Sequence, residues 1–284
     1  MRISLNTSKW YDNIWAALIF FTRLPLWRLY QPPKECYKAV VEYWPLSGWL
    51  TGLTMALVFA LCSMILPHGL ALVIAIASRI LLTGALHEDG LCDFFDGMGG
   101  GISRERILAI MKDSRIGTYG VLGLVLYLLL LYNAISSIPL PLAVLTIAVA
   151  DPYAKMLAAQ ITQMMPYART EEESKAKTVY RRMNIRAGLS LFIQGFIPLA
   201  VLLWFLGGAI NWQIIVFGPC IVMYLLYLLI WRKLRGYTGD CCGAMFLLIE
   251  LGVYICMASQ TFNNIAVVNV FDNIINTYLN IQWK

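Results

Sequence analysis

A short acidic stretch that follows directly on an apolar run constrains this chain more than any other feature. Residues 87–97 read His-Glu-Asp-Gly-Leu-Cys-Asp-Phe-Phe-Asp-Gly, and the run before them, 71–86, carries a single charge. If the stretch is helical, Asp89, Asp93 and Asp96 lie within about 60° of one another on one face. Like charges repel, and Mg²⁺ prefers carboxylate oxygens, which it often shares with substrate phosphates. The spacing therefore predicts that the three aspartates bind a magnesium ion.

A solvated helix end is the alternative interpretation of these acids. We expect the helix to continue out of the apolar run, so that the acids lie towards its C-terminal end, where the helix dipole makes negative charge unfavourable. A local penalty of this kind is typical of a binding site. His87 precedes the acids and is a candidate base or ligand-orienting group. On an ideal helix it points about 160° away from Asp89, which disfavours a role as a metal ligand.

The composition identifies an integral membrane protein. Of the 284 residues, 60% are hydrophobic and 13% are charged, whereas a soluble domain carries about 25% charged residues. No polar linker divides the chain, so we expect one domain over residues 1–284. Apolar runs near the ~20 residues that a spanning helix needs lie at 46–66, 70–86, 117–136, 142–162, 188–207, 213–231 and 243–260. The predicted fold is an all-α, polytopic transmembrane bundle of about seven spans, with residues 15–25 as an interfacial or re-entrant helix.

The distribution of Lys and Arg predicts the orientation in the membrane. Nineteen of the 22 lie in four segments, at 1–45, 102–115, 167–187 and 232–236. By the positive-inside rule, these segments and the acidic stretch face the cytoplasm across the inner membrane. The tail, 261–284, then lies outside, where its helical spacing of apolar residues suggests an amphipathic helix. The net charge of +6 reflects the cytoplasmic face and anionic lipid, and gives no indication of nucleic-acid binding.

Two polar segments follow the acidic stretch and are expected at the same, cytoplasmic face of the membrane. The glycines at 97 and at 99–101 predict either a flexible exit from the helix or a backbone cradle for phosphate. Further on, Lys112 and Arg115 could neutralise phosphate oxygens, and Asp113 could bind metal or act as a base. A membrane-side anchor would explain the two cations but not the acid between them.

Four charged residues lie inside predicted spans: Arg79, Asp151, Lys155 and Glu250. An ionisable group in hydrocarbon is unfavourable unless it faces a partner or a cavity. We therefore expect Arg79 or Lys155 to pair with Glu250, with Asp151 or with a substrate phosphate. Asp240 stands at the start of the last span, where capping of the helix is the alternative to a role in the site.

The order of these motifs matches one known family. The matching segments are Thr-Arg-Leu-Pro at 22–25, Trp-Pro-Leu-Ser-Gly at 44–48, the block 84–97, Arg-Glu-Arg at 104–106, the block 110–121, Pro-Tyr-Ala-Arg at 166–169 and Thr-Gly-Asp at 238–240. From about residue 15 to about residue 255, the chain resembles the adenosylcobinamide-GDP ribazoletransferases, the membrane cobalamin synthases of the nucleotide-loop pathway. The block from 84 to 121 is the most specific part of the resemblance.

The resemblance implies a reaction and a set of site residues. A ribose hydroxyl of α-ribazole, or of its 5′-phosphate, attacks the cobinamide-side phosphorus of adenosylcobinamide-GDP, GMP leaves, and adenosylcobalamin or its 5′-phosphate forms. Mg²⁺ is the implied metal, held by Asp89, Asp93 and Asp96. The implied catalytic residues are Asp113, Asp96 and His87, and the implied substrate- or phosphate-binding residues are Lys112, Arg115, Arg104, Arg169 and Asp240.

Three positions depart from the family's pattern. Glu88 stands where Leu is usual, which disfavours it as a ligand. Lys155 stands where Arg is common, and a lysine cannot make the bidentate phosphate contact of an arginine. The segment 170–186 lacks the usual glycine-rich stretch, so its part in acceptor binding is open.

Two other functions are alternatives. A CDP-alcohol phosphotransferase of lipid metabolism also uses a carboxylate-bound metal at the membrane, but its motif has an Ala-Arg pair after the first Asp-Gly, and here Cys92-Asp93 occupies that place. A cation transporter would place its acids near the bilayer midplane, whereas these acids cluster at one interface. A homo-oligomer is compatible with each of these functions.

Overall fold

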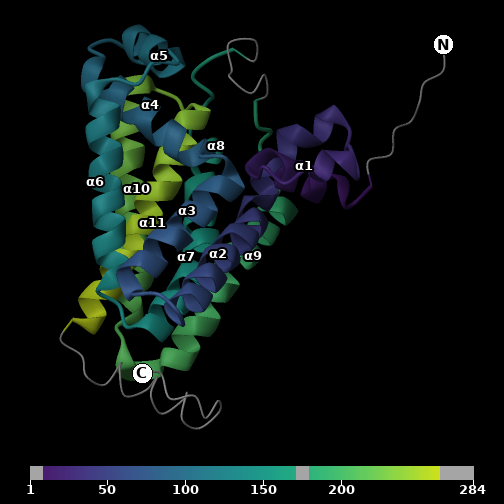
Figure 1. Ribbon diagram of the computed structural model, residues 1–284. Coiled ribbons are helices and arrows are strands. Elements are labelled where there is room, and N and C mark those ends of the chain that lie inside the picture. The colour runs from purple at the N-terminus through teal and green to yellow at the C-terminus, as the bar shows by residue number, and fades with distance from the viewer. Residues whose placement is uncertain (1–8, 171–178, 263–284) are drawn as a thin grey trace.

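All regular structure in the described part of the chain is helical. The structure is a computed structural model that describes residues 9–170 and 179–262. Its helices are α1 (Asp12–Phe21), α2 (Trp44–Ser63), α3 (His68–Thr83), α4 (Leu86–Gly100), α5 (Arg104–Lys112), α6 (Thr118–Ser136), α7 (Leu140–Ala159), α8 (Ile161–Met164), α9 (Ile185–Leu206), α10 (Trp212–Leu234) and α11 (Gly239–Thr261), with 3₁₀ segments at Leu26–Arg28, Lys34–Tyr43 and Gly207–Ala209. Figure 1 shows one helical bundle, which confirms the all-α prediction.

The predicted spans correspond to long apolar helices. Within the described residues, six helices are long and apolar enough to cross a membrane, and the bent pair α3 and α4 raises that number to seven if it counts as one span. Each predicted span overlaps one of α2, α3, α6, α7, α9, α10 and α11. The apolar helix expected at 15–25 is α1, which is too short to span. The amphipathic helix expected at 261–284 lies almost wholly outside the described residues.

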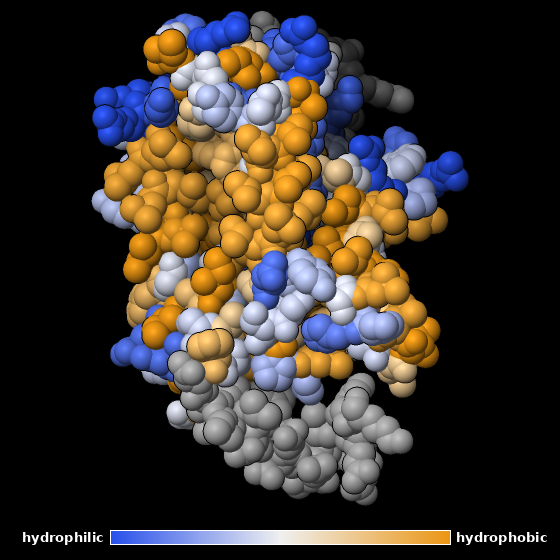
Figure 2. Space-filling model, turned by 60° about the vertical axis from the view of Figure 1, so that its left-hand side comes forward, coloured by the Kyte–Doolittle hydropathy of each residue, from blue (hydrophilic) through white to orange (hydrophobic). Residues whose placement is uncertain are grey.

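The bundle is built around α7 and α11, whose side chains are mostly buried. In contrast, α6, α9 and α10 expose many Leu, Ile, Val and Phe side chains, and Figure 2 shows an apolar band across the middle of the molecule. Such a band is the surface that a helical bundle presents to lipid. Small residues bring the central helices together, since a Cβ on Gly48 of α2 would lie 2.8 Å from Asp151 Oδ1 of α7.

Hydrogen bonds join the segments that carry most of the cations. Arg104 Nε donates to the carbonyl of Leu234 at 2.8 Å, and its Nη2 donates to the carbonyl of Ala168 at 2.7 Å. Arg181 pairs with Glu42 at 2.6 Å, which connects the residues before α9 to the N-terminal part of the chain. The basic segments therefore adjoin one another, as their charge distribution predicts. That they face the cytoplasm stays a prediction.

The chain bends sharply between α3 and α4, so, contrary to expectation, the acids do not lie at the C-terminal end of a helix that continues from the apolar run. Gly84 and Ala85 both have left-handed backbone conformations, with φ of 66° and 58°, and the two helices meet at 90°. Gly84 tolerates this conformation because it has no Cβ. The acids thus lie on a new helix, and Glu88 and Asp89 occupy its first turn, where the helix dipole favours negative charge.

The glycines at 97–101 form the end of α4, with Gly101 as its C-cap, as the helix-exit alternative predicts. Helix α4 continues to Gly100, so its backbone N–H groups are largely used within the helix. A Cβ on Gly97 would lie 2.7 Å from Met111 Cγ, and one on Gly99 would lie 2.6 Å from Tyr119 Cγ. The glycines also allow α5 and the start of α6 to pack against the end of α4.

Helices α4 and α11 cross with their backbones almost in contact. A Cβ on Gly90 of α4 would lie 3.2 Å from Asp240 Cα, and a Cβ on Gly243 of α11 would lie 3.3 Å from the carbonyl oxygen of His87. Residues beside the crossing are therefore brought together, Asp89 next to Gly90 on one helix and Asp240 on the other. This crossing positions the site described below.

A buried ion pair links α3 to α11. Arg79 Nη1 lies 2.6 Å from both carboxylate oxygens of Glu250. Tyr254 donates to Glu250 Oε1 at 3.0 Å, and Arg79 Nη2 donates to Tyr127 at 3.2 Å. The pairing of Arg79 with Glu250, one of the predicted alternatives, is confirmed.

A second buried pair lies within α7. Lys155 Nζ is 2.6 Å from Asp151 Oδ1, one helical turn away, and it donates to Thr51 at 2.8 Å. Thr51 in turn donates to Asp151 Oδ2 at 2.6 Å. Because the Lys155 side chain is fully buried, it is held in the core rather than presented to a phosphate.

The break between α3 and α4 can be tested at Gly84. An alanine at this position would have to adopt a left-handed backbone conformation, and its Cβ would clash with the side chain of Arg23. Arg23 is held in place because its backbone N–H donates to the carbonyl of Leu82 at 2.7 Å. We expect Gly84→Ala to destabilise the protein by about 1–3 kcal/mol, measured as a lower melting temperature in detergent. The control is Gly188→Ala, because Gly188 has open space around its Cβ position. Equal melting temperatures for the two variants would contradict the bend.

The ion pair between Arg79 and Glu250 predicts a non-additive mutation series. Arg79→Leu leaves a carboxylate buried without its cation, which costs about 3–5 kcal/mol and lowers both yield and melting temperature. The double variant Arg79→Leu/Glu250→Leu removes both charges and should recover much of the loss. A double variant no more stable than Arg79→Leu would show that the pairing is not the source of the defect.

Candidate active site

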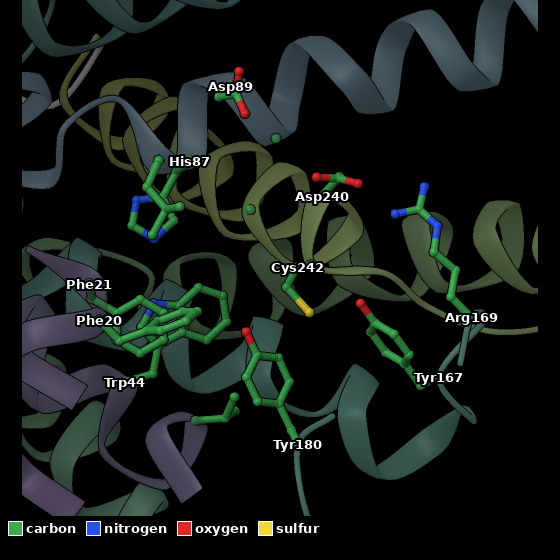
Figure 3. Close-up of a pocket in the computed structure, with 15 residues that line it drawn as sticks. Phe20, Phe21, Trp44, His87, Asp89, Tyr167, Arg169, Tyr180, Asp240 and Cys242 are labelled. Carbon is green, nitrogen blue, oxygen red and sulfur yellow. The ribbon is translucent and has the colours of Figure 1, made fainter. Parts of the chain in front are cut away.

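A pocket opens where α4, α11, α1 and the segment before α9 meet. Its volume is about 780 Å³ with its mouth included, and its walls are Phe20, Phe21, Val41, Trp44, Leu86, His87, Asp89, Gly90, Tyr167, Arg169, Tyr180, Gly239, Asp240, Cys242 and Gly243. In Figure 3, Asp89, Asp240 and Arg169 lie along one side of the pocket, Phe20, Phe21 and Trp44 lie together at the opposite end, and Tyr167 lies close to Arg169. The pocket thus has a polar end and an aromatic end.

The polar end is made of side chains from three segments. Asp89 is exposed on α4, and Asp240 projects from the first turn of α11. Thr238, rather than Asp240, caps α11, since its hydroxyl accepts from the N–H of Cys241 at 3.3 Å. The Asp89 and Asp240 carboxylates and the Arg169 guanidinium border one space in Figure 3. Asp93, one turn after Asp89, is half-buried on the same side of α4.

Arg169 is positioned by the backbone around it. Its Nη2 donates to the carbonyl of Leu108 in α5 at 2.8 Å. Residues 166–168 pair with the segment before α11 through two backbone hydrogen bonds, from Ala168 N to Tyr237 O at 2.8 Å and from Tyr237 N to Pro166 O at 3.0 Å. Arg104 donates to this same segment, so it supports the pocket wall and does not line the pocket itself.

Asp96 lies away from this pocket, against the start of α6. Its two carboxylate oxygens accept from the N–H groups of Gly117 at 2.6 Å and Gly120 at 2.8 Å. A carboxylate at this position complements the positive end of the α6 dipole. The predicted ligands Asp89 and Asp96 share a helix face, but seven residues along a helix correspond to about 10 Å, which is too far for one ion to bridge directly.

Asp113 and Arg115 lie in a second pocket with Asp96. That pocket, of about 1050 Å³, also includes Arg106, Gly117 and Tyr119 among its walls. Asp113 and Arg115 pair at 2.6 Å, and the hydrogen bonds from Arg115 lower the pKa of Asp113 to about 2. Lys112 is exposed nearby at the end of α5. The structure therefore separates these predicted residues from Asp89 and Asp240, and their roles in the reaction stay predictions.

His87 and Trp44 belong to the aromatic end. Both are almost fully buried, yet neither His87 Nε2 nor Trp44 Nε1 has a hydrogen-bond partner among the described residues. Sequence reasoning did not identify Phe20, Phe21 or Tyr180 as site residues. They come from segments far apart along the chain and show no motif of their own.

Glu88 lies between two lining residues, His87 and Asp89, but is not itself part of the pocket wall. It is buried, and its Oε2 has no partner within the described part of the chain. It does not line the second pocket either. Of the predicted segment 170–186, residues 171–178 lie outside the described residues.

The polar end fits a magnesium ion that shares its ligands with substrate. Within residues 9–170 and 179–262, no three His, Cys, Asp or Glu side chains stand ready as one metal-binding group. Mg²⁺ is commonly bound through one or two carboxylates plus substrate phosphates and water. Asp89 and Asp93, one turn apart on α4, supply two such carboxylates, with Asp240 across the helix crossing.

Comparison with known proteins identifies the family. The family model described as cobalamin-5-phosphate synthase matches residues 13–258. The chain belongs to the cobalamin-5-phosphate synthase family. No solved structure shows a significant match.

Curated relatives with one name are similar over most of their length. The adenosylcobinamide-GDP ribazoletransferase of Vibrio parahaemolyticus is 38% identical over 243 residues, which covers 85% of this chain and 89% of the relative. The proteins of the same name from Ralstonia pickettii and Shewanella baltica are 34% and 35% identical, and each is covered to 93%. Since these relatives are enzymes of small-molecule metabolism by name, the pocket is a candidate active site.

The three aspartates of α4 should respond differently to substitution. We expect Asp89→Asn and Asp93→Asn to abolish turnover while membrane insertion stays intact. Asp96→Asn should also lower the melting temperature, because it weakens charge-assisted hydrogen bonds worth about 1.5–3 kcal/mol. Melting curves and product assays on the purified variants measure both effects. Near-normal activity of Asp93→Asn would contradict the assignment of that residue to the metal.

Proposed function

We propose that the protein transfers the adenosylcobinamide phosphate group of adenosylcobinamide-GDP to a ribose hydroxyl of α-ribazole or of its 5′-phosphate, with release of GMP. The observation that carries the proposal is the joint position of Asp89, Asp240 and Arg169 in one pocket, in a chain of this family. Two carboxylates and a guanidinium suit a reaction in which negative charge on a diphosphate must be neutralised and a hydroxyl deprotonated.

The side chains of the polar end take distinct parts in the transfer. Asp240 orients the acceptor hydroxyl and takes its proton. The hydroxyl oxygen bonds to the cobinamide-side phosphorus, the bond from that phosphorus to the bridging oxygen breaks, and GMP leaves with that oxygen. Arg169 pairs with the diphosphate oxygens, and a guanidinium can do so through two parallel hydrogen bonds.

Asp89 and Asp93 hold Mg²⁺ in this proposal. The ion supplies charge neutralisation to the diphosphate when it is bound. The two carboxylates lie one turn apart on α4, where Asp89 is exposed and Asp93 is half-buried. Asp96 takes a supporting part, since it fixes the start of α6 beside the acidic face.

The acidic face of α4 also suggests how the donor lies. It runs from the pocket of Asp89 to the second pocket, where Arg106 and Arg115 provide cations. A donor laid along this face would keep its reacting phosphorus near Asp89. Its leaving nucleotide would then extend towards Arg115 and Lys112. The site would lie on the cytoplasmic side of the inner membrane, because nucleotides are present in the cytoplasm.

The decisive assay uses the purified protein in detergent. It is incubated with adenosylcobinamide-GDP, α-ribazole and Mg²⁺, and GMP and the corrinoid product are quantified. We expect both products in equal amounts, their loss on addition of EDTA, and their return with excess Mg²⁺. Folded protein that releases no GMP would contradict the proposal. Turnover of CDP-alcohol donors or cation uptake into vesicles would then identify one of the alternative functions.

A further inference from the structure

The aromatic end of the pocket has the construction of a binding site for a flat ring. Phe21 and Trp44 stack with centroids 5.3 Å apart and planes at 12°, and His87 lies 6.0 Å from Trp44 at 21°. These rings form one wall. In Figure 3, Tyr180 lies next to this wall and Tyr167 lies farther from it, beside Arg169. Aromatic walls of this kind bind bases by stacking, which contributes about 1–3 kcal/mol per base.

Two buried nitrogen atoms in this wall have no partner. Trp44 is 2% exposed and His87 is 3% exposed, and neither Trp44 Nε1 nor His87 Nε2 has a hydrogen-bond partner among the described residues. An unpaired buried polar group is unfavourable, so a ligand that pairs with these atoms gains from their position. The indole N–H is a donor only, whereas the imidazole Nε2 can donate or accept according to its tautomer.

We propose that this aromatic end binds the base of the acceptor nucleoside, a flat bicyclic heterocycle with apolar edges and a single ring-nitrogen acceptor, and that Trp44 and His87 determine the specificity for it. The inference rests on the proposed function, because it takes that nucleoside as the ligand. The single ring-nitrogen acceptor of such a base can take a hydrogen bond from the Trp44 indole N–H or from a protonated His87 Nε2. A guanine base, with several donors and acceptors on its edges, would leave most of them unpaired among Phe20, Phe21 and Val41.

Binding of the acceptor base at the aromatic end would place the acceptor ribose near the carboxylates at the polar end. Asp89 and Asp240 line the same pocket as Trp44 and Phe21. A nucleoside with its base against the aromatic wall therefore extends its ribose towards the two carboxylates, where the hydroxyl is needed. His87 is a positioning residue in this arrangement, and it does not act as the base of the reaction.

Kinetics with single substitutions test the subsite. Trp44→Phe keeps an aromatic ring and removes the indole N–H, so it should raise the KM for the acceptor roughly 2- to 10-fold, the range that one net hydrogen bond supplies. The KM for the donor and kcat should stay unchanged. His87→Phe should act in the same direction. Trp204→Phe is the matched control, because Trp204 is 76% exposed on α9, outside the pocket.

The outcomes separate the possible occupants. A rise in the donor KM alone would place the guanine or the corrin group at the aromatic end and would overturn the inference. Unchanged kinetics in both variants would show that no substrate contacts these rings, which would also overturn it.

A binding measurement without turnover separates this inference from the proposed function. A benzimidazole ribonucleoside is titrated into the wild-type protein and the three variants in detergent, by calorimetry. Weaker binding to Trp44→Phe and His87→Phe than to Trp204→Phe supports the subsite, even if no GMP is formed in the transfer assay. Equal binding by all the proteins, together with normal GMP release, would overturn the subsite and leave the proposed function intact.

Discussion

The near-contact of α4 and α11 at Gly90 and Gly243 is the constraint on which the site depends. Because Gly90 and Gly243 have no side chains, the backbones of two helices from distant parts of the chain approach so closely that an added Cβ would press on the other backbone. Asp89 and Asp240 are thereby held at one pocket by rigid elements rather than by loops. A binding constellation on helices is more precise than one on loops, and this matters for a transfer in which a hydroxyl must meet a phosphorus atom.

The buried ion pairs give this crossing a fixed base. Arg79 and Glu250 join α3 to α11, while Lys155 pairs with Asp151, and its Nζ is 4.7 Å from the ring of Phe246. Phe246 in turn contacts His87, with ring centroids 4.8 Å apart. The charged core and the aromatic end thus touch through one ring. The two buried ion pairs stabilise the packing of the helices. The charged side chains proposed to take part in the reaction lie instead at the polar end of the pocket.

The sequence predicts the helical bundle well, because apolar runs of spanning length and the distribution of cations are local signals. It does not predict the bend at Gly84 and Ala85, where two left-handed residues redirect the chain, so that the acids lie on a new helix with Glu88 and Asp89 in its first turn. The face shared by Asp89, Asp93 and Asp96 was a correct inference from periodicity. Position along the helix axis separates them, and the contact of Asp96 with Gly117 and Gly120 depends on tertiary packing. The aromatic end could not be predicted, since Phe21, Trp44, His87 and Tyr180 meet only in the folded chain.

The central claim is that Asp89 and Asp93, at the α4–α11 crossing, hold the divalent ion. Electron paramagnetic resonance during titration with Mn²⁺, a substitute for Mg²⁺, tests it most directly on the purified protein with the donor present. The account predicts tight Mn²⁺ binding by the wild type and by Asp113→Asn, and its loss in Asp89→Asn and Asp93→Asn. Retention of tight Mn²⁺ binding by the α4 variants, with loss in Asp113→Asn, would contradict the account and move the metal to the second pocket.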